Sequence, residues 1–197
     1  MKKLLSIGLI MMLSMSLLTG CGLIDGIFGE KANGVIIYGE TQQIDKAIEK
    51  HKSKISEKNT FPVKLIEAQD KKVLALSSKT AEELIKKELL KKVVKDSDTQ
   101  IITSLPSIPA DGAILFAKEK VSNLPINGIT AKYEDNIIIG DGRSYADMFL
   151  IVDETAFAKL QGTDKSMAAL KYSKNPKNEM QDLSSEVEKA QMVTMKK

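Results

Sequence analysis

The apolar positions after residue 34 first follow a strand-like pattern and then a helical one. Residues 35–38 (VIIY) are apolar and largely β-branched, which is typical of a buried strand. A helix is predicted next, over about 42–56. Its buried face is expected to carry the side chains that recur at helical spacing, namely Ile44, Ile48, His51 and Ile55.

The pattern then predicts two more strands, a second helix and a further strand. Residues 62–68 alternate like a strand, and residues 73–77 form another apolar run. Thr80-Ala81-Glu82-Glu83 has the spacing of a capping box, so a helix is expected over 81–94. Residues 100–105 predict the last strand. The order β-α-β-β-α-β favours a ferredoxin-like lobe, with four antiparallel strands and both helices on one face.

The second half of the chain is richer in strand signals. Strands are predicted at 112–118, 148–153 and 167–173. Turn signals at 127–128 and 134–136 flank residues 129–133, and a hairpin with 137–140 is expected there. Helices are predicted at 154–160, capped by Asp153, and from Asp182 or Ser184 through Val193. The predicted fold class is therefore α+β, with a ferredoxin-like βαββαβ lobe at 34–106 and a strand-rich α+β lobe with a C-terminal helix at 107–197.

Residues 1–20 have a different character from the rest of the chain. Lys2 and Lys3 precede an apolar stretch over 4–18, which is shorter than the ~20 residues of a spanning helix but suits a secretory signal peptide. It ends in Leu18-Thr19-Gly20-Cys21, which resembles the lipobox of bacterial lipoproteins. The alternatives are an ordinary secretory signal cleaved elsewhere and an uncleaved membrane anchor.

The lipobox resemblance implies how the chain is processed and where it is located. Cleavage would fall between Gly20 and Cys21, and the Cys21 thiol would carry a diacylglycerol with fatty acids such as palmitate. Two or three acyl chains hold a protein stably on a bilayer, whereas one chain binds reversibly. Residues 21–33, with three glycines, would form a lipidated tether. We therefore expect a domain on the extracytoplasmic face of the cell membrane.

Composition narrows the possible functions of the mature chain. Removing residues 1–20 takes away Lys2 and Lys3 and leaves 177 residues, with 27 basic and 26 acidic side chains. A nearly neutral chain gives no reason to expect a nucleic-acid partner. Cys21 is the only cysteine, so a lipidated chain has no disulfide, thiolate metal site or cysteine nucleophile.

Candidate catalytic groups are few. His51 is the only histidine, which excludes a metal site built from several histidines, and we interpret it as a half-buried structural residue. No pair of carboxylates can be singled out for sugar hydrolysis among 26 acidic residues. We therefore predict no enzymatic activity, no metal and no cofactor.

The loop at 140–147 is the segment that looks most suited to binding. It contains two glycines, two carboxylates, a tyrosine and the only arginine of the chain, but lacks the spacing of a calcium or phosphate loop. The alternative is an ordinary turn with Arg143 paired to a carboxylate. The candidate interaction residues are Gly140, Asp141, Gly142, Arg143, Tyr145 and Asp147.

Two resemblances bear on function. The chain looks like the small uncharacterised lipoproteins of low-GC Gram-positive bacteria. Residues 148–176 are also similar to the end of the extracellular domain of macrolide-exporter-type (FtsX-like) ABC permeases, although the chain has no permease helices. The resemblance implies an accessory role, so the first hypothesis is a non-catalytic interaction lipoprotein with an envelope or membrane protein partner. The alternatives are a small solute-binding lipoprotein and an envelope hydrolase.

Overall fold

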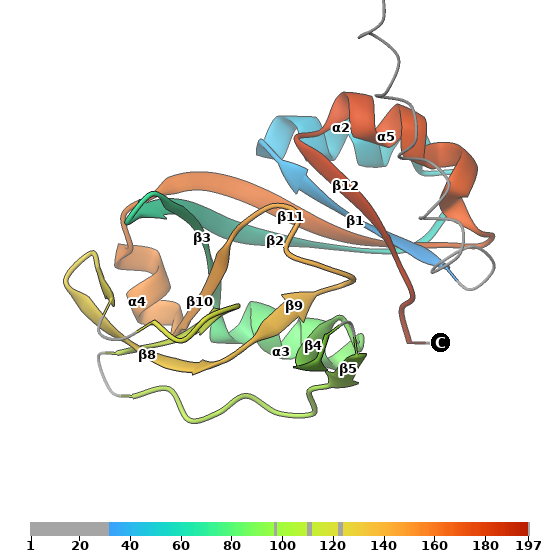
Figure 1. The fold of residues 1–197 in the computed structure, drawn as a ribbon. Coiled ribbons are helices and arrows are strands. Elements are labelled where there is room, and N and C mark those ends of the chain that lie inside the picture. Colours follow the sequence, from blue (N-terminus) through green and yellow to red (C-terminus); the bar gives the residue numbers. More distant parts are fainter. Residues whose placement is uncertain (1–31, 97, 110–111, 122–123, 197) are drawn as a thin grey trace, which may run out of the picture.

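The computed structural model describes residues 32–96, 98–109, 112–121 and 124–196 (Figure 1). The predicted signal peptide, Cys21 and most of the predicted tether lie outside the described residues. Within them, a large mixed sheet is combined with a few short helices. The predicted α+β fold class is confirmed.

Nine strands of the described residues form one sheet in the order β12-β1-β11-β2-β3-β10-β6-β8-β7. β10 pairs in parallel with β3, and β6 pairs in parallel with β8, while the other neighbours are antiparallel. The strands are β1 (Gly34–Gly39), β2 (Ile55–Ala68), β3 (Lys71–Ser77), β6 (Ala113–Ala117), β7 (Leu124–Ile126), β8 (Ile129–Asp135), β10 (Met148–Val152), β11 (Thr163–Tyr172) and β12 (Lys189–Val193).

A smaller sheet of three strands has the order β5-β4-β9. These strands are β4 (Leu90–Lys95), β5 (Asp98–Ile101) and β9 (Ile137–Ile139). The helices are α2 (Thr41–His51), α3 (Ser78–Lys86), α4 (Glu154–Lys159) and α5 (Met180–Glu186), with a 3-10 turn η1 (Pro176–Glu179) before α5. Figure 1 shows the small sheet beside α3, on the side away from α2 and α5.

Alternating side chains of the large sheet build separate apolar cores on its two faces. On β1, Ile36 and Tyr38 face a core that contains Leu84 of α3, whereas Val35 and Ile37 face a core that contains Ile44 of α2. The same alternation holds across β11, β3, β10 and β6. α2, α5 and α4 therefore cover one face of the sheet, and α3 with the small sheet covers the other.

The apolar runs predicted as buried strands are confirmed, because these strands are covered on both faces. All residues of β1, β6 and β10 are buried. The strand predicted at 167–173 is the buried end of β11. The helix predicted at 154–160 is α4, and the Asp153 carboxylate caps it by accepting a 2.8 Å hydrogen bond from the Ala156 amide.

The predicted four-stranded antiparallel sheet of residues 35–105 is not formed, although the element order β-α-β-β-α-β is present. β11 lies between β1 and β2, and β4 joins the small sheet with β9. α2 and α3 lie on opposite faces rather than the same one. Strands from 34–106 and from 107–197 thus belong to one sheet, because β11 pairs with β1 along one edge and with β2 along the other.

Three predicted helices end earlier than their sequence patterns suggest. α2 ends at His51, and β2 begins at Ile55. α3 ends at Lys86, where Glu88 takes a left-handed φ of 59° and the Leu89 amide donates to the Leu84 carbonyl. Residues 90–94, predicted as helix, instead belong to strand β4 (Leu90–Lys95). Similarly, residues 189–193 form β12 because they pair with β1.

The predicted hairpin between 129–133 and 137–140 is also wrong. β8 instead forms a hairpin with β7 through the turn at Asn127 and Gly128, both of which have positive φ. β9 leaves the large sheet and pairs with β4. In the part of the chain that the structure describes, no helix is both long and apolar enough to cross a membrane.

Candidate functional site

The 140–147 loop connects β9 to β10, and its first residue is fixed by the strand beside it. Gly140 has a φ of 65°, and its amide donates a 2.7 Å hydrogen bond to the Leu89 carbonyl at the start of β4. Ile139 and Gly142 form an isolated β-bridge. The loop therefore begins as a tight turn against the small sheet.

Asp141 forms an ion pair that joins the loop to β4. Its Oδ1 lies 3.0 Å from Nζ of Lys91, and the two side chains are only 13% and 17% exposed. Burial raises the pKa of the Asp141 carboxyl above its ordinary value, and Lys91 partly opposes that rise. The buried Oδ2 accepts no hydrogen bond within the described residues. Asp141 is thus committed to an internal contact.

Arg143 is bound by its own chain instead of standing free in solvent. Its Nη2 donates to Oδ1 of Asn136 at 2.7 Å, and its Nη1 donates to the Asp147 carbonyl at 3.0 Å. The guanidinium lies over the Phe149 ring, with Cζ 4.9 Å from the centroid. Burial lowers the pKa of Arg143 to about 10. These contacts hold the loop between β8 and β10.

Tyr145 and Asp147 connect the loop to the large sheet. The Tyr145 ring stacks on Tyr38 with centroids 4.6 Å apart, and its hydroxyl donates to Glu188 at 2.7 Å. Burial and this hydrogen bond raise the pKa of Tyr145 far above its usual range. The Asp147 carboxylate accepts a 2.9 Å hydrogen bond from the Lys72 amide. The structure therefore brings the six candidate residues together, and the side chains of those that are not glycine make contacts within the fold.

The surface that this loop supports is the small sheet, whose outer strand is β5. All four residues of β5 are exposed, and within the described residues β5 pairs only with β4. Val94 and Ile101, on the two strands of this hairpin, are the large hydrophobic residues found exposed, at 52% and 44%. Sequence reasoning missed this surface because it assigned 81–94 to a helix. The β-branched pair Val93-Val94 before a polar turn was the available signal.

A cleft of about 470 Å³ lies at α4 on the opposite face of the large sheet. Its lining includes Asp153, Thr155 and Lys159, together with the turn between β7 and β8. Across the lining, the Asn127 side chain donates a 2.8 Å hydrogen bond to the Gln161 carbonyl. Most of its lining residues are polar, whereas small-molecule sites are usually lined mostly by apolar ones.

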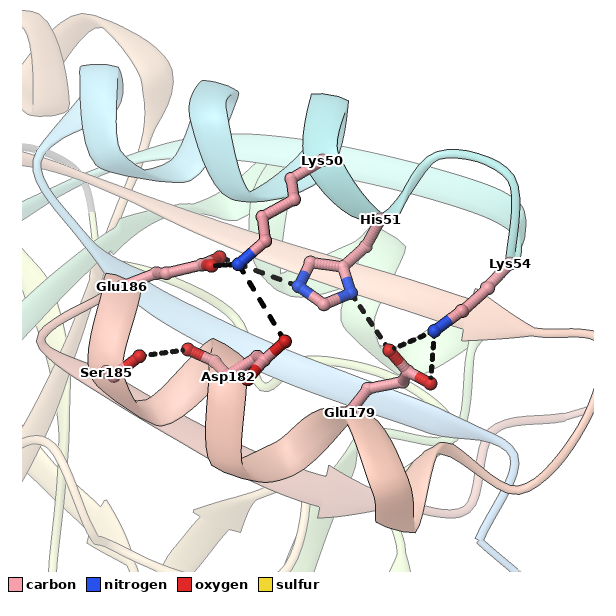
Figure 2. Close-up of polar contacts among 7 residues, drawn as sticks. All are labelled: Lys50, His51, Lys54, Glu179, Asp182, Ser185 and Glu186. Carbon is pink, nitrogen blue, oxygen red and sulfur yellow. Dashed lines mark hydrogen bonds and ion pairs between the residues drawn. The ribbon is translucent and has the colours of Figure 1, made fainter.

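His51 is fully buried at the end of α2, where two carboxylates face its ring (Figure 2). Nδ1 lies 3.2 Å from Oε2 of Glu179, and Nε2 lies 3.5 Å from Oε2 of Glu186. Lys54 contacts both Glu179 oxygens at 2.7 Å, and Lys50 pairs with Glu186. Across the described ranges, no group of three or more His, Cys, Asp or Glu residues is arranged to hold a metal ion.

The predicted lipidation site, Gly20-Cys21, lies outside the described residues. Relatives of the chain therefore provide the evidence on whether it is a lipoprotein. A family described as an uncharacterised lipoprotein family matches residues 32–196. The chain belongs to this family. This lipoprotein is similar to a candidate lipoprotein from Bacillus anthracis whose crystal structure is known. The two sequences are 38% identical, the match covers 84% of this chain and 100% of that chain, and the TM-score is 0.80. No match to the chain was found among curated proteins.

Membership in a lipoprotein family indicates that the protein belongs to the cell envelope and is held at a membrane. Neither the family description nor that of the Bacillus anthracis structure names a catalytic activity. The match begins at residue 32, where the described residues of the folded domain begin. Residues 148–176 form β10, α4 and β11 and the start of η1.

Proposed function

We propose that this lipoprotein is a membrane-anchored, extracytoplasmic accessory protein that binds another envelope protein and catalyses no reaction. The observation that carries the proposal is the exposed β4–β5 hairpin, with an open strand edge and exposed Val94 and Ile101. Exposed apolar side chains beside unpaired backbone groups are a common basis of protein–protein recognition.

The backbone of β5 is suited to pairing with an added strand. Leu90 is opposite Ile102 in the ladder, and the Ile102 amide donates to the Leu90 carbonyl at 3.1 Å. Because the direction of backbone groups alternates along a strand, the Thr99 and Ile101 amides and carbonyls point away from β4. We infer that the partner presents an extended segment to this edge, as in β-strand addition.

The proposed partner is an integral membrane protein, with a complex of the ABC-permease type as the first candidate. If Cys21 carries lipid, the 11 residues 21–31 can span at most ~40 Å between the bilayer and the described domain. Such tethering raises the effective concentration for a membrane partner, so a small interface is sufficient. The similarity of residues 148–176 to a permease extracellular domain supports the same class of partner.

Site-specific crosslinking in intact cells tests this proposal. Cys21 is the only cysteine and is expected to be blocked by lipid, so Gln100→Cys introduces a single reactive thiol on the β5 edge. We expect it to crosslink an integral membrane protein, and Ile101→Pro to reduce the yield several-fold. Proline removes an amide that points outward and leaves the β4 ladder intact.

The matched control is Lys46→Cys, at an exposed position of α2 on the other face of the molecule. Arg143→Ala, tested in the same way, separates the hairpin from the loop behind it. Equal crosslinking from residues 46 and 100, or none from residue 100, would disprove the assigned surface. Loss of crosslinking in Arg143→Ala with an intact fold would instead place the partner on the 140–147 loop.

The cleft at α4 supports a second candidate function, binding of a small solute. Lys159 and Asp153 offer charges of both signs beside the apolar side chains of Ile129 and Leu160. Thermal unfolding with panels of sugars, short peptides and metal salts distinguishes the two functions. A concentration-dependent rise in Tm that Lys159→Ala removes would favour solute binding.

A further inference from the structure

The buried end of α2 holds an imidazole whose two ring nitrogens both face carboxylates. Glu179 approaches Nδ1 from η1, and Glu186 approaches Nε2 from α5 (Figure 2). The His51 side chain is 4% exposed, so water cannot readily take the place of either partner. His51 Nε2 and Glu186 Oε2 are both buried without a hydrogen-bond partner among the described residues.

A neutral imidazole cannot satisfy this arrangement, because it has one N–H donor and one lone pair. Whichever nitrogen lacks the proton directs its lone pair at a carboxylate oxygen in a buried site, which is repulsive. A doubly protonated ring has a hydrogen-bonded Glu179 oxygen at Nδ1 and an ion-pair partner, Glu186, 3.5 Å from Nε2. We propose that His51 is an imidazolium in the folded chain and that it closes a pH-sensitive clasp between α2 and the η1–α5 segment.

The charges around the ring support this assignment. Around the ring lie Lys50 on α2, Lys54 after α2, Glu179 on η1, Glu186 on α5 and Tyr172 on β11, while the exposed Asp182 of α5 contacts Lys50. Burial raises the pKa of Tyr172 to about 12, so its hydroxyl is neutral. The charges nearest the ring nitrogens are the Glu179 and Glu186 carboxylates, at 3.2 and 3.5 Å, and both favour an imidazolium.

The clasp holds the C-terminal part of the large sheet in place. α5 ends at Glu186, and β12 begins at Lys189 beside β1. Between them, Glu188 accepts the hydrogen bond of Tyr145. Histidine side chains change charge near neutral pH, so the contribution of an imidazolium is present at low pH and is lost as the pH rises. Alkaline conditions should therefore loosen α5 and β12 before the rest of the fold.

Nitrogen NMR of the imidazole tests the protonation state directly, since His51 is the only histidine and its ring signals are unambiguous. In the mature chain, purified in detergent micelles, we expect both nitrogens to be protonated at pH 7. The signals of a neutral tautomer at that pH would overturn the proposal. So would a chelator-sensitive shift of one nitrogen, because a metal ion would then supply the positive charge.

Hydrogen exchange tests the clasp itself. After correction for intrinsic exchange, we expect protection of α5 and β12 amides to fall about tenfold between pH 5.5 and 8.5, the size of one charge-assisted hydrogen bond. The β10 amides should not change. His51→Gln should abolish this pH dependence, and Glu186→Gln, which keeps the imidazole, should weaken it. An unchanged dependence in either folded variant, or none in the wild type, would refute the clasp.

Discussion

Gly140 and Gly142 are two residues apart in one loop, yet only one of them needs to be glycine. Gly140 has a left-handed φ of 65°, and a Cβ there would lie 2.7 Å from Cγ1 of Val193 and 3.0 Å from Cδ1 of Ile36. A Cβ at Gly142 would meet nothing within 4 Å. The first glycine lets the loop pass close to β1 and β12, and the second occupies open space.

Alanine at these two positions should therefore affect stability differently, and Gly142 serves as the control for Gly140. Gly140→Ala should lower the free energy of unfolding by about 2–4 kcal/mol, because backbone strain and overpacking add. Gly142→Ala should change it by less than about 0.5 kcal/mol. Urea denaturation of both variants measures the effect. Equal losses would mean that the contacts of Gly140 relax without cost.

At the scale of elements, the contact between α2 and η1–α5 depends on carboxylates that must stay ionised. Lys54 donates to both oxygens of Glu179, and this hydrogen-bonded pair lowers the pKa of the Glu179 carboxyl below its ordinary value. Lys54 lies in the turn that follows α2, and Glu179 is the last residue of η1, 125 residues later. The pair therefore connects the turn after α2 to the 3-10 turn that leads into α5.

The sign of the pKa shift predicts how this contact responds to acid. A carboxyl with a lowered folded-state pKa stabilises the fold above its unfolded value of about 4.3, and that contribution is lost as the pH falls through the folded value. Stability should therefore decrease below about pH 4.3. Glu179→Gln should flatten this part of the profile and destabilise the fold at pH 7. Chemical denaturation across pH 2.5–7 provides the measurement.

The control for this experiment is Glu67→Gln, at an exposed position of β2. It removes one carboxylate from the sheet without touching the α2–α5 contact. A profile for Glu179→Gln that coincides with that of Glu67→Gln would show that the Lys54–Glu179 pair does not contribute to acid sensitivity. The His51 clasp acts in a higher pH range, so the two effects can be measured separately.

At the scale of the whole molecule, the two ends of the described domain are joined. The Asn33 side chain donates to the Met195 carbonyl at 3.0 Å and accepts from the Met195 amide at 2.7 Å. The Asn33 amide also donates to the Val193 carbonyl. The described domain therefore begins beside its C-terminal strand, while β5 belongs to the small sheet on the opposite face from α2 and α5 (Figure 1).

We predict that attachment to the membrane depends on one residue outside the described domain, Cys21. Cys21→Ala should release the domain from the membrane or leave an uncleaved precursor, because the thiol that would carry diacylglycerol is missing. Fractionation of host cells and mass spectrometry of the N-terminus measure the outcome. Ser144→Ala, an exposed change in the folded domain, should leave attachment unaffected. An unlipidated mature N-terminus at a residue other than Cys21 in the wild type would contradict this mechanism.

Local features were readable in the sequence because local physics produces them. The apolar runs of β1, β6 and β10 predict strands covered on both faces, and the structure buries them completely. Asp153 caps α4 through an amide only three residues away. The turn at Asn127-Gly128 has the positive φ angles that these residue types favour. The lipobox is likewise a local pattern, and membership in a lipoprotein family agrees with it.

Pairing between distant segments was decided only by the tertiary structure. β1 hydrogen-bonds to β11 and β12, more than 120 residues later, and no local periodicity specifies those partners. Residues 90–95 have a helical pattern of apolar positions, but pairing with β9 and β5 makes them a strand. Arg143 belongs to the predicted interaction loop, and only the fold places it against Asn136, Asp147 and Phe149. The exposed edge of β5 follows from the same pairing, because a strand's free edge exists only once its partners are chosen.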